Sequence, residues 1–163
     1  MKIFPRLMLA LALLAGFLVP MAANAQSAEA ATYVQNVRYL ANKYGCGPVN
    51  IVIYAWNGHQ GAAAPWENKM YIKPGLSYYR LKYVVAHECA HFKQYRIGGS
   101  TLAGWYSQMN RMNAIYGGSN YSGLEQNADC VTRVLGLTGQ HYTTSCSGYR
   151  RTAAWNTWYG RAS

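Results

Sequence analysis

The chain has 163 residues, of which 51% are apolar and 12% are charged, and fifteen Lys and Arg against five Asp and Glu give a formal charge of +10. The apolar fraction excludes a wholly disordered chain, because burying that much apolar surface can offset the entropy lost on folding. The length predicts one domain, or two only if both are small. The sequence contains no collagen period and no run of like charges.

Residues 1–25 have the pattern of a signal peptide. Lys2 and Arg6 give a basic start, residues 7–23 are almost continuously apolar, and Ala23-Asn24-Ala25 matches the small residues of a cleavage site. Cleavage there predicts a mature chain that starts at Gln26 and is exported, either to the periplasm or out of the cell. The alternative is an uncleaved membrane anchor, although about 17 apolar residues is the lower limit for a span. We expect no membrane span after signal removal.

The remaining residues, 26–163, predict a single α+β domain that is mainly helical. Apolar positions at helical spacing predict helices over residues 28–44, 77–97, 101–116, 123–135 and 149–159. Residues 50–56 are rich in β-branched and aromatic side chains and residues 69–73 alternate in polarity, so we expect a small β-sheet beside the helix over 77–97. Residues 57–68 contain two Gly, Pro65 and three consecutive Ala, which predicts a loop, and its Trp66 is a candidate to cover a cleft.

Four cysteines remain in the mature chain, and an even number in an oxidising compartment predicts two disulfides. Three pairings are open. We favour Cys46 with Cys89 and Cys130 with Cys146, because the second pair closes a short loop and the first staples the N-terminal region to the central helix. The other two pairings stay open at this point.

His87-Glu88-Cys89-Ala90-His91 lies inside the longest predicted helix of the domain. Residues four apart on a helix lie one turn above each other, so both imidazoles can converge on one metal ion. Glu88 projects beside that ion, where a base for an ion-bound water would stand. This is the HExxH arrangement of zinc peptidases. The alternative is that the two histidines only pack or form surface hydrogen bonds.

A second pair of residues supports the metal-site hypothesis. Glu125 and Asp129 are four apart, and with Glu88 they make up three of only five acids in the chain. A catalytic zinc needs a third protein ligand, which Glu125 can supply, while Asp129 can accept the free N–H of a ligating histidine. Glu125 has a competing role, because Ser122-Gly-Leu-Glu125 also matches a capping box. His141 is the alternative third ligand, or a donor to the substrate oxyanion.

These motifs resemble the gluzincin metallopeptidases. The details are closer to bacterial neutral zinc metallopeptidases with an HExxH…ExxAD pattern, matched here by Ala86-His-Glu-Cys-Ala-His-Phe-Lys-Gln94 and Leu124-Glu-Gln-Asn-Ala-Asp-Cys130. The resemblance covers residues 66–137, including the strand Met70-Tyr-Ile-Lys-Pro74 upstream. It implies a zincin-like fold in which that strand lines the cleft. The residues that it implies are the zinc ligands His87, His91 and Glu125, the base Glu88 and the supporting Asp129.

The resemblance has two departures. The chain is shorter than these enzymes, and it lacks a clear counterpart of their oxyanion-stabilising residue. His141, Tyr142 and Tyr121 are the candidates for that role.

The sequence therefore predicts an exported zinc-dependent endopeptidase that binds one Zn²⁺ per chain and hydrolyses protein or peptide substrates. The alternatives are a catalytically inactive zinc-carrying or envelope-binding protein of the same fold, and a basic, aromatic-rich binding module. Basic residues are spread along the chain without a tight cluster, which suits ordinary solubility or attraction to an anionic envelope polymer. No nucleic-acid-binding motif is present, so we expect no specific nucleic-acid partner.

Overall fold

A computed structural model describes residues 19–163 of the chain. The predicted signal peptide therefore lies outside the described residues up to position 18, and its last residues form the start of helix α2 (Val19–Lys43). The predicted cleavage point after Ala25 falls inside that helix. The described chain divides into two units at Gln35, and the strands and the helices after α2 belong to the second, Asn36–Ser163. Within the described part of the chain, no helix has the length and apolar character needed to cross a membrane.

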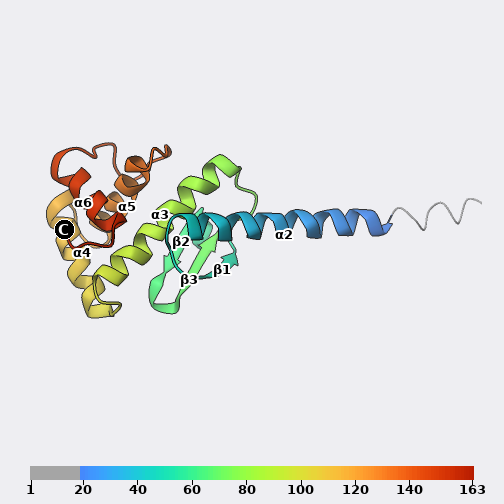
Figure 1. The fold of residues 1–163 in the computed structure, drawn as a ribbon, viewed down its shortest axis with the longest axis horizontal. Coiled ribbons are helices and arrows are strands. Elements are labelled where there is room, and N and C mark those ends of the chain that lie inside the picture. Colours follow the sequence, from blue (N-terminus) through green and yellow to red (C-terminus); the bar gives the residue numbers. More distant parts are fainter. Residues whose placement is uncertain (1–18) are drawn as a thin grey trace, which may run out of the picture. The chain divides into compact units, whose positions relative to one another are not determined.

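The second unit is an α+β structure, which confirms the predicted fold class (Figure 1). After the end of α2 come three strands, which are β1 (Asn50–Ile53), β2 (Gly61–Ala64) and β3 (Lys69–Ile72). Short 3-10 turns over Trp56–Gly58 and Pro65–Glu67 flank β2. Four helices follow, and they are α3 (Tyr78–Ile97), α4 (Leu102–Tyr116), α5 (Ser122–Val134) and α6 (Gly148–Trp158). Each of these four helices begins and ends within one residue of a helix predicted from the sequence.

The sheet has the order β1-β3-β2, with β1 parallel and β2 antiparallel to the central strand β3. The predicted loop over residues 57–68 is therefore wrong in part, because residues 61–64 form an edge strand. The sequence Gly-Ala-Ala-Ala has little intrinsic preference for a strand, so its conformation is imposed by pairing with β3 from Gly61 opposite Ile72 to Ala64 opposite Lys69. The first predicted strand also ends earlier than expected, at Ile53.

Helix α3 is the central element of this unit and runs between the sheet and helices α4 to α6 (Figure 1). Its side chains are buried almost without interruption from Leu81 to Phe92, including Val84 and Val85. A helix that is covered on all sides loses the usual alternation of apolar and polar faces. Buried polar residues in α3 are therefore placed between two packed layers, and they need specific partners.

The far layer is a helical core in which α5 packs against α3, α4 and α6. Apolar side chains from these helices form one cluster, whose large members are Trp105, Met112, Tyr116, Leu124 and Val131. The layer holds α5 rigidly beside α3. It thereby fixes which residues of α5 face the HExxH turns.

Both disulfides of the favoured pairing are present, Cys46–Cys89 and Cys130–Cys146, with Cα atoms 4.8 Å and 5.4 Å apart. No described cysteine is free. The first bond ties the chain just after α2 to the middle of the HExxH segment. The second ties α5 to the segment that precedes α6. Two disulfides are compatible with an oxidising environment outside the cytoplasm.

Removing either disulfide should destabilise the protein, and removing Cys46–Cys89 should cost more. The two bonds join residues 43 and 16 positions apart. The chain-entropy relation then gives losses of about 4 and about 3 kcal/mol, because the larger loop restricts the unfolded chain more. Chemical denaturation of the double alanine variants, Cys46→Ala/Cys89→Ala and Cys130→Ala/Cys146→Ala, would measure the difference. Equal or negligible losses would contradict this expectation.

Candidate metal centre

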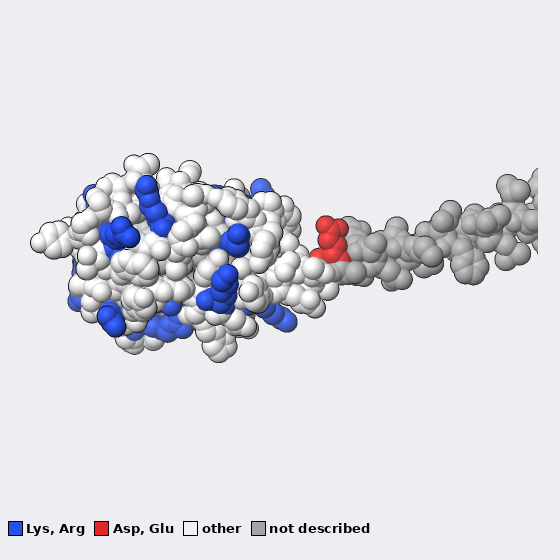
Figure 2. All heavy atoms as spheres, turned by 45° about the horizontal axis from the view of Figure 1, so that its top comes forward, with Lys and Arg blue, Asp and Glu red and all other residues white. Residues whose placement is uncertain are grey.

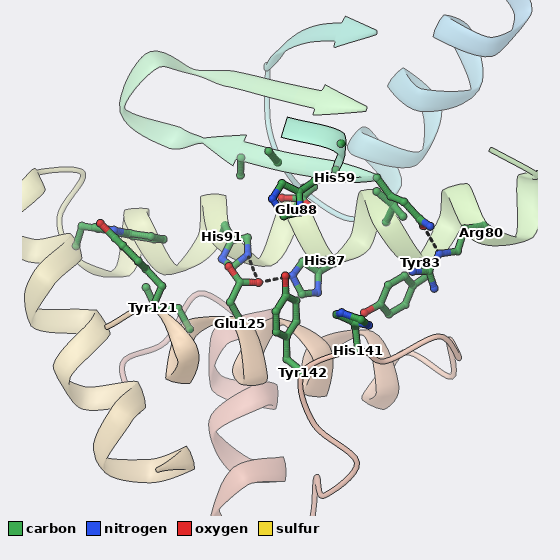
Figure 3. Close-up of a pocket in the computed structure, with 18 of the residues that line it drawn as sticks. His59, Arg80, Tyr83, His87, Glu88, His91, Tyr121, Glu125, His141 and Tyr142 are labelled. Atoms are coloured by element: carbon green, nitrogen blue, oxygen red, sulfur yellow. Dashed lines mark hydrogen bonds and ion pairs between the residues drawn. The ribbon is translucent and has the colours of Figure 1, made fainter. Parts of the chain in front are cut away.

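Three side chains from two helices converge at the centre of the unit. His87 and His91 come from successive turns of α3, and Glu125 comes from the first turn of α5. Oε2 of Glu125 lies 2.9 Å from Nε2 of His87 and 3.4 Å from Nε2 of His91 (Figure 3). One potential ligand atom from each residue lies within 4.8 Å of the others, so the group could hold a metal ion.

The donor set fits a metal ion in number, type and spacing. Two imidazole nitrogens and one carboxylate oxygen are typical ligands of divalent transition metals. Tetrahedral bonds of about 2.0–2.1 Å would place such ligand atoms about 3.3 Å apart. The two nitrogen-to-oxygen distances, 2.9 and 3.4 Å, lie on either side of that value. Sequence reasoning had placed these three residues together, and the structure brings them together.

The capping role considered for Glu125 is wrong. Ser122 is itself the first residue of α5, and its hydroxyl accepts a hydrogen bond from the backbone N–H of Ser119. The residue before the helix, Tyr121, makes no side-chain cap. Because no capping box forms, the Glu125 carboxylate is available to the two histidines.

Asp129 supports His87 at Nδ1, the ring nitrogen that does not face Glu125. Nδ1 of His87 lies 3.1 Å from Oδ1 of Asp129, an ion-pair distance whose angle falls short of a regular hydrogen bond. The Tyr83 hydroxyl donates to the same oxygen. The other oxygen accepts backbone N–H groups of residues 141–143 at 2.5–3.1 Å. Asp129 therefore holds both the imidazole of His87 and the loop beside it.

Gln94 does the same for His91, and sequence reasoning missed it. Its Oε1 lies 2.8 Å from Nδ1 of His91, and this fixes the tautomer that leaves Nε2 facing Glu125. The amide nitrogen of Gln94 donates to the backbone oxygen of Leu124 and to Oδ1 of Asn127, both on α5. Gln94 is fully buried. The available signal was its position three residues after His91 on the same helix.

The electrostatics of the group favour a positive charge at its centre. Burial opposes protonation of His87, but Asp129 and Glu125 outweigh it and raise the pKa of His87 to about 10. Burial alone would raise the pKa of Glu125, yet the two histidines hold it below its ordinary value. Burial likewise opposes ionisation of Asp129, whose pKa is lowered by His87, Tyr83 and the loop amides. A proton or a metal ion can supply the charge that this pair of carboxylates attracts.

The three residues line one wall of a cavity of about 510 Å³ that is roofed by β2 and bordered by residues 141–142. Figure 3 shows Glu88 on the side of α3 nearer the sheet, next to His59, while Glu125 approaches from the opposite side. Burial raises the pKa of Glu88 against the opposing effect of the two histidines. A Cβ atom at Gly61 would lie only 2.5 Å from the Glu88 carboxylate, so β2 must carry glycine there to approach this closely.

The expectation that the strand Met70–Pro74 lines the cleft is wrong, because the strand on the cavity is β2. The order β1-β3-β2 explains the difference, since β3 lies in the middle of the sheet and β2 forms the edge. The signal for β2 was weak in the sequence. Its small side chains look like a loop, although small side chains are also what allows a strand to pass close to α3.

The three candidate donors to the oxyanion lie at different places in the cavity. Tyr142 lies with its ring 5.7 Å from that of His87 and its hydroxyl toward His87 and Glu125 (Figure 3). Burial, with nearby carboxylates, raises its pKa to about 12. His141 lines the cavity wall beside Tyr83 and does not join the group of ligands, so the structure favours Glu125 over His141 as the third one. Tyr121 lies toward the far end of the cavity (Figure 3).

Replacing Glu125 by alanine should abolish tight metal binding. A residue that only supports a ligand is worth about 10–100-fold in metal affinity, and a direct ligand should exceed that. We expect the unmodified protein to retain one Zn²⁺ per chain after desalting, and Glu125→Ala to lose it. Glu67→Ala is the matched control, because Glu67 is an exposed acid paired only with Lys69. Full retention by Glu125→Ala in elemental analysis would show that the ligand is another residue.

The contact between Gln94 and His91 can be tested separately. Gln94→Met removes the acceptor for His91 and the two donors to α5, whereas Gln94→Glu removes only the donors. We expect metal affinity to fall by about 10–100-fold in the Met variant and to be largely kept in the Glu variant. Competition with a fluorescent zinc chelator would measure both. Equal affinities of the Met variant and the unmodified protein would show that Gln94 has no role in orienting His91.

Comparison with models of known protein families, with curated proteins and with solved structures finds no match for this chain. The resemblance noted above therefore rests on its two short motifs. The geometry supports a candidate metal centre. Two helices bring together three potential ligand atoms, each histidine has a partner beside its second nitrogen, and Glu88 lines the same cavity.

Proposed function

We propose that this protein is an exported zinc-dependent endopeptidase with a zincin-like fold. The observation that carries the proposal is the convergence of His87, His91 and Glu125 in a cavity that Glu88 also lines. His87, His91 and Glu125 would hold the ion. Zinc fits better than calcium or magnesium, because those ions prefer oxygen ligands and two of these three ligands are nitrogens. When bound, zinc supplies an acidified water and polarises the carbonyl of the scissile bond.

Glu88 is the proposed general base. Helix α3 places its carboxylate in the cavity beside the proposed ligands, next to the glycine of β2, Gly61. In hydrolysis it would take the proton of the attacking water at a carboxylate oxygen while the new C–O bond forms. It would then deliver that proton to the leaving amine nitrogen as the C–N bond breaks. One buried carboxylate thus serves both proton transfers.

Tyr142 is the proposed donor to the developing oxyanion. Its hydroxyl faces the ligand group, and a pKa of about 12 keeps it protonated over the physiological range. A preorganised donor of this kind is typically worth about 10²–10³ in rate. The loop amides of residues 141–143 are fixed on Asp129, which orders the backbone on which Tyr142 stands. His141 and Tyr121 are less well placed for this role.

The edge strand β2 supports a peptide as the substrate. In the part of the chain that the structure describes, β2 pairs with β3 on one side only, and its residues 61–63 line the cavity together with residues of α3. An unpaired strand edge offers a row of N–H and C=O groups to which an extended chain can add. A peptide bound this way would lie across the ligand group with its backbone fixed by hydrogen bonds.

Export and envelope contact complete the proposal. The two disulfides suit an oxidising compartment, which agrees with the predicted signal peptide. Figure 2 shows Lys and Arg spread over one face of the domain with no acid among them, a surface that would attract an anionic envelope polymer. Such attraction requires no dedicated pocket. It also serves the alternative function, an inactive zinc-carrying protein bound to the envelope.

Substituting Glu88 by glutamine should separate these functions. We expect Glu88→Gln to keep one zinc per chain but to lose hydrolysis of casein and of envelope peptides by about 10²–10⁴-fold, because only the proton-transfer group is removed. Glu67→Gln makes the same change at an exposed acid and should keep full activity. If the zinc-loaded unmodified protein cleaves no protein or peptide substrate, the peptidase proposal fails and the zinc-carrying alternative is favoured.

A further inference from the structure

The two ends of the cavity differ in chemistry. Figure 3 places Arg80 at one end and Tyr121 at the other, with the ligand group between them. The Tyr121 end carries an aromatic side chain (Figure 3), and Trp66 and Trp105 also line the cavity, with their ring centroids 6.3 Å apart. The Arg80 end carries a positive charge.

That charge has no acidic partner among residues 29–163. Arg80 is held by neutral acceptors, donating through Nε to Gln60 Oε1 and through Nη1 to the backbone oxygen of Gly139 at 3.0 Å. Its guanidinium lies 4.5 Å from the centre of the Tyr83 ring. These contacts hold the guanidinium between Gln60, just before β2, and the loop over residues 139–142, and they leave its charge unneutralised. A rigidly held, uncompensated guanidinium favours binding of a carboxylate.

The acids of the unit are all committed elsewhere. Glu67 pairs with Lys69, and Glu125 and Asp129 face His87. Glu88 directly follows His87 in α3 and lies on the side nearer the sheet, beside His59 (Figure 3). Within residues 36–163, no ion pair therefore joins a carboxylate to Arg80.

The spacing along α3 sets where a bound carboxylate would lie. Arg80 precedes His87 by seven residues of continuous helix. A rise of about 1.5 Å per residue separates them by about 10 Å along the axis. An extended peptide covers that length in about three residues. A carboxylate held by Arg80 would therefore belong to a residue about three positions from the scissile bond.

We infer that the cleft selects peptides that carry a carboxylate about three residues from the bond cleaved, and that Arg80 is the specificity-determining residue. The inference rests on the proposed peptidase function, and it adds the substrate class. The carboxylate can be an acidic side chain or a free C-terminus, which present the same chemistry. The general excess of Lys and Arg over acids in the chain would add long-range attraction for such peptides.

Peptide pairs that differ only by Glu or Gln test this inference. The pairs are blocked at both ends, with the variable residue placed at each position up to four from the cleaved bond. Cleavage is measured with the zinc-loaded protein, and binding is measured with Glu88→Gln by fluorescence anisotropy. We expect about tenfold preference for Glu at about the third position, since a hydrogen bond to a charged group is worth at least that factor. A peptide with a free C-terminal carboxylate at that position, and no Glu, tests the second source.

Arg80→Gln should reduce the ratio between Glu and Gln peptides to about one, and Arg80→Lys should keep a part of it because the charge remains. Lys82→Gln is the matched control, since Lys82 lies two residues away on α3, contacts the Tyr78 and Tyr79 rings, and does not line the cavity. It should keep the full ratio. A ratio that is equally reduced in Lys82→Gln would assign the preference to overall charge and overturn the role of Arg80.

The outcomes separate the two proposals. Equal binding and cleavage of Glu and Gln peptides at every position would overturn the carboxylate inference while cleavage itself supports the peptidase. Preference for Glu in binding without any cleavage by the zinc-loaded protein would support the carboxylate site and remove the peptidase function.

Discussion

The packing of α5 against α3 is the constraint on which the site depends. In a basic chain with only five acids, α5 carries two of them on one face, and that face lies against the two histidines of α3. Glu125 faces the Nε2 atoms and Asp129 faces Nδ1 of His87, so one helix supplies both a candidate ligand and the support for another. Burying these charges is expensive unless they are paired, and the apolar cluster of α4 to α6 stabilises the arrangement. The same packing that forms the core therefore also brings the candidate ligands together.

Rigidity around the ligands comes from a buried polar network that extends away from the cavity. Gln94 links His91 to Asn127, whose amide group contacts the Tyr116 hydroxyl and the Thr157 hydroxyl. Tyr116 in turn donates to the backbone oxygen of Arg150 at the start of α6. The orientation of one imidazole is thus connected to three helices. A network in which each member has partners holds a unique geometry, and a metal site with a preset geometry loses less entropy on binding its ion.

The sequence predicted the long helices, the disulfide set and the convergence of the candidate ligands. Each has a local signature: helical periodicity, cysteine number and the spacing of His87, His91, Glu125 and Asp129. It did not predict β2, whose four small residues become a strand only through pairing with β3. Nor did it predict Gln94 or Arg80. Their roles depend on what α5 and the 139–142 loop place beside them, and such contacts between distant segments have no pattern in the chain. The capping box at Ser122 matched a real motif, but α5 begins one residue too early for it to form.

Asp129 divides its two oxygens between different tasks, one directed at His87 and Tyr83 and the other at the amides of residues 141–143. The imidazole of His87 and the loop that carries Tyr142 are therefore both held by the same carboxylate. A ligand that displaces the loop from Asp129 would also change the pKa of His87, because Asp129 contributes to that pKa. A change in charge at His87 would in turn change how strongly Asp129 accepts the hydrogen bonds of the loop amides. Binding in the cleft and the basicity of the His87 imidazole are therefore coupled through the Asp129 carboxylate.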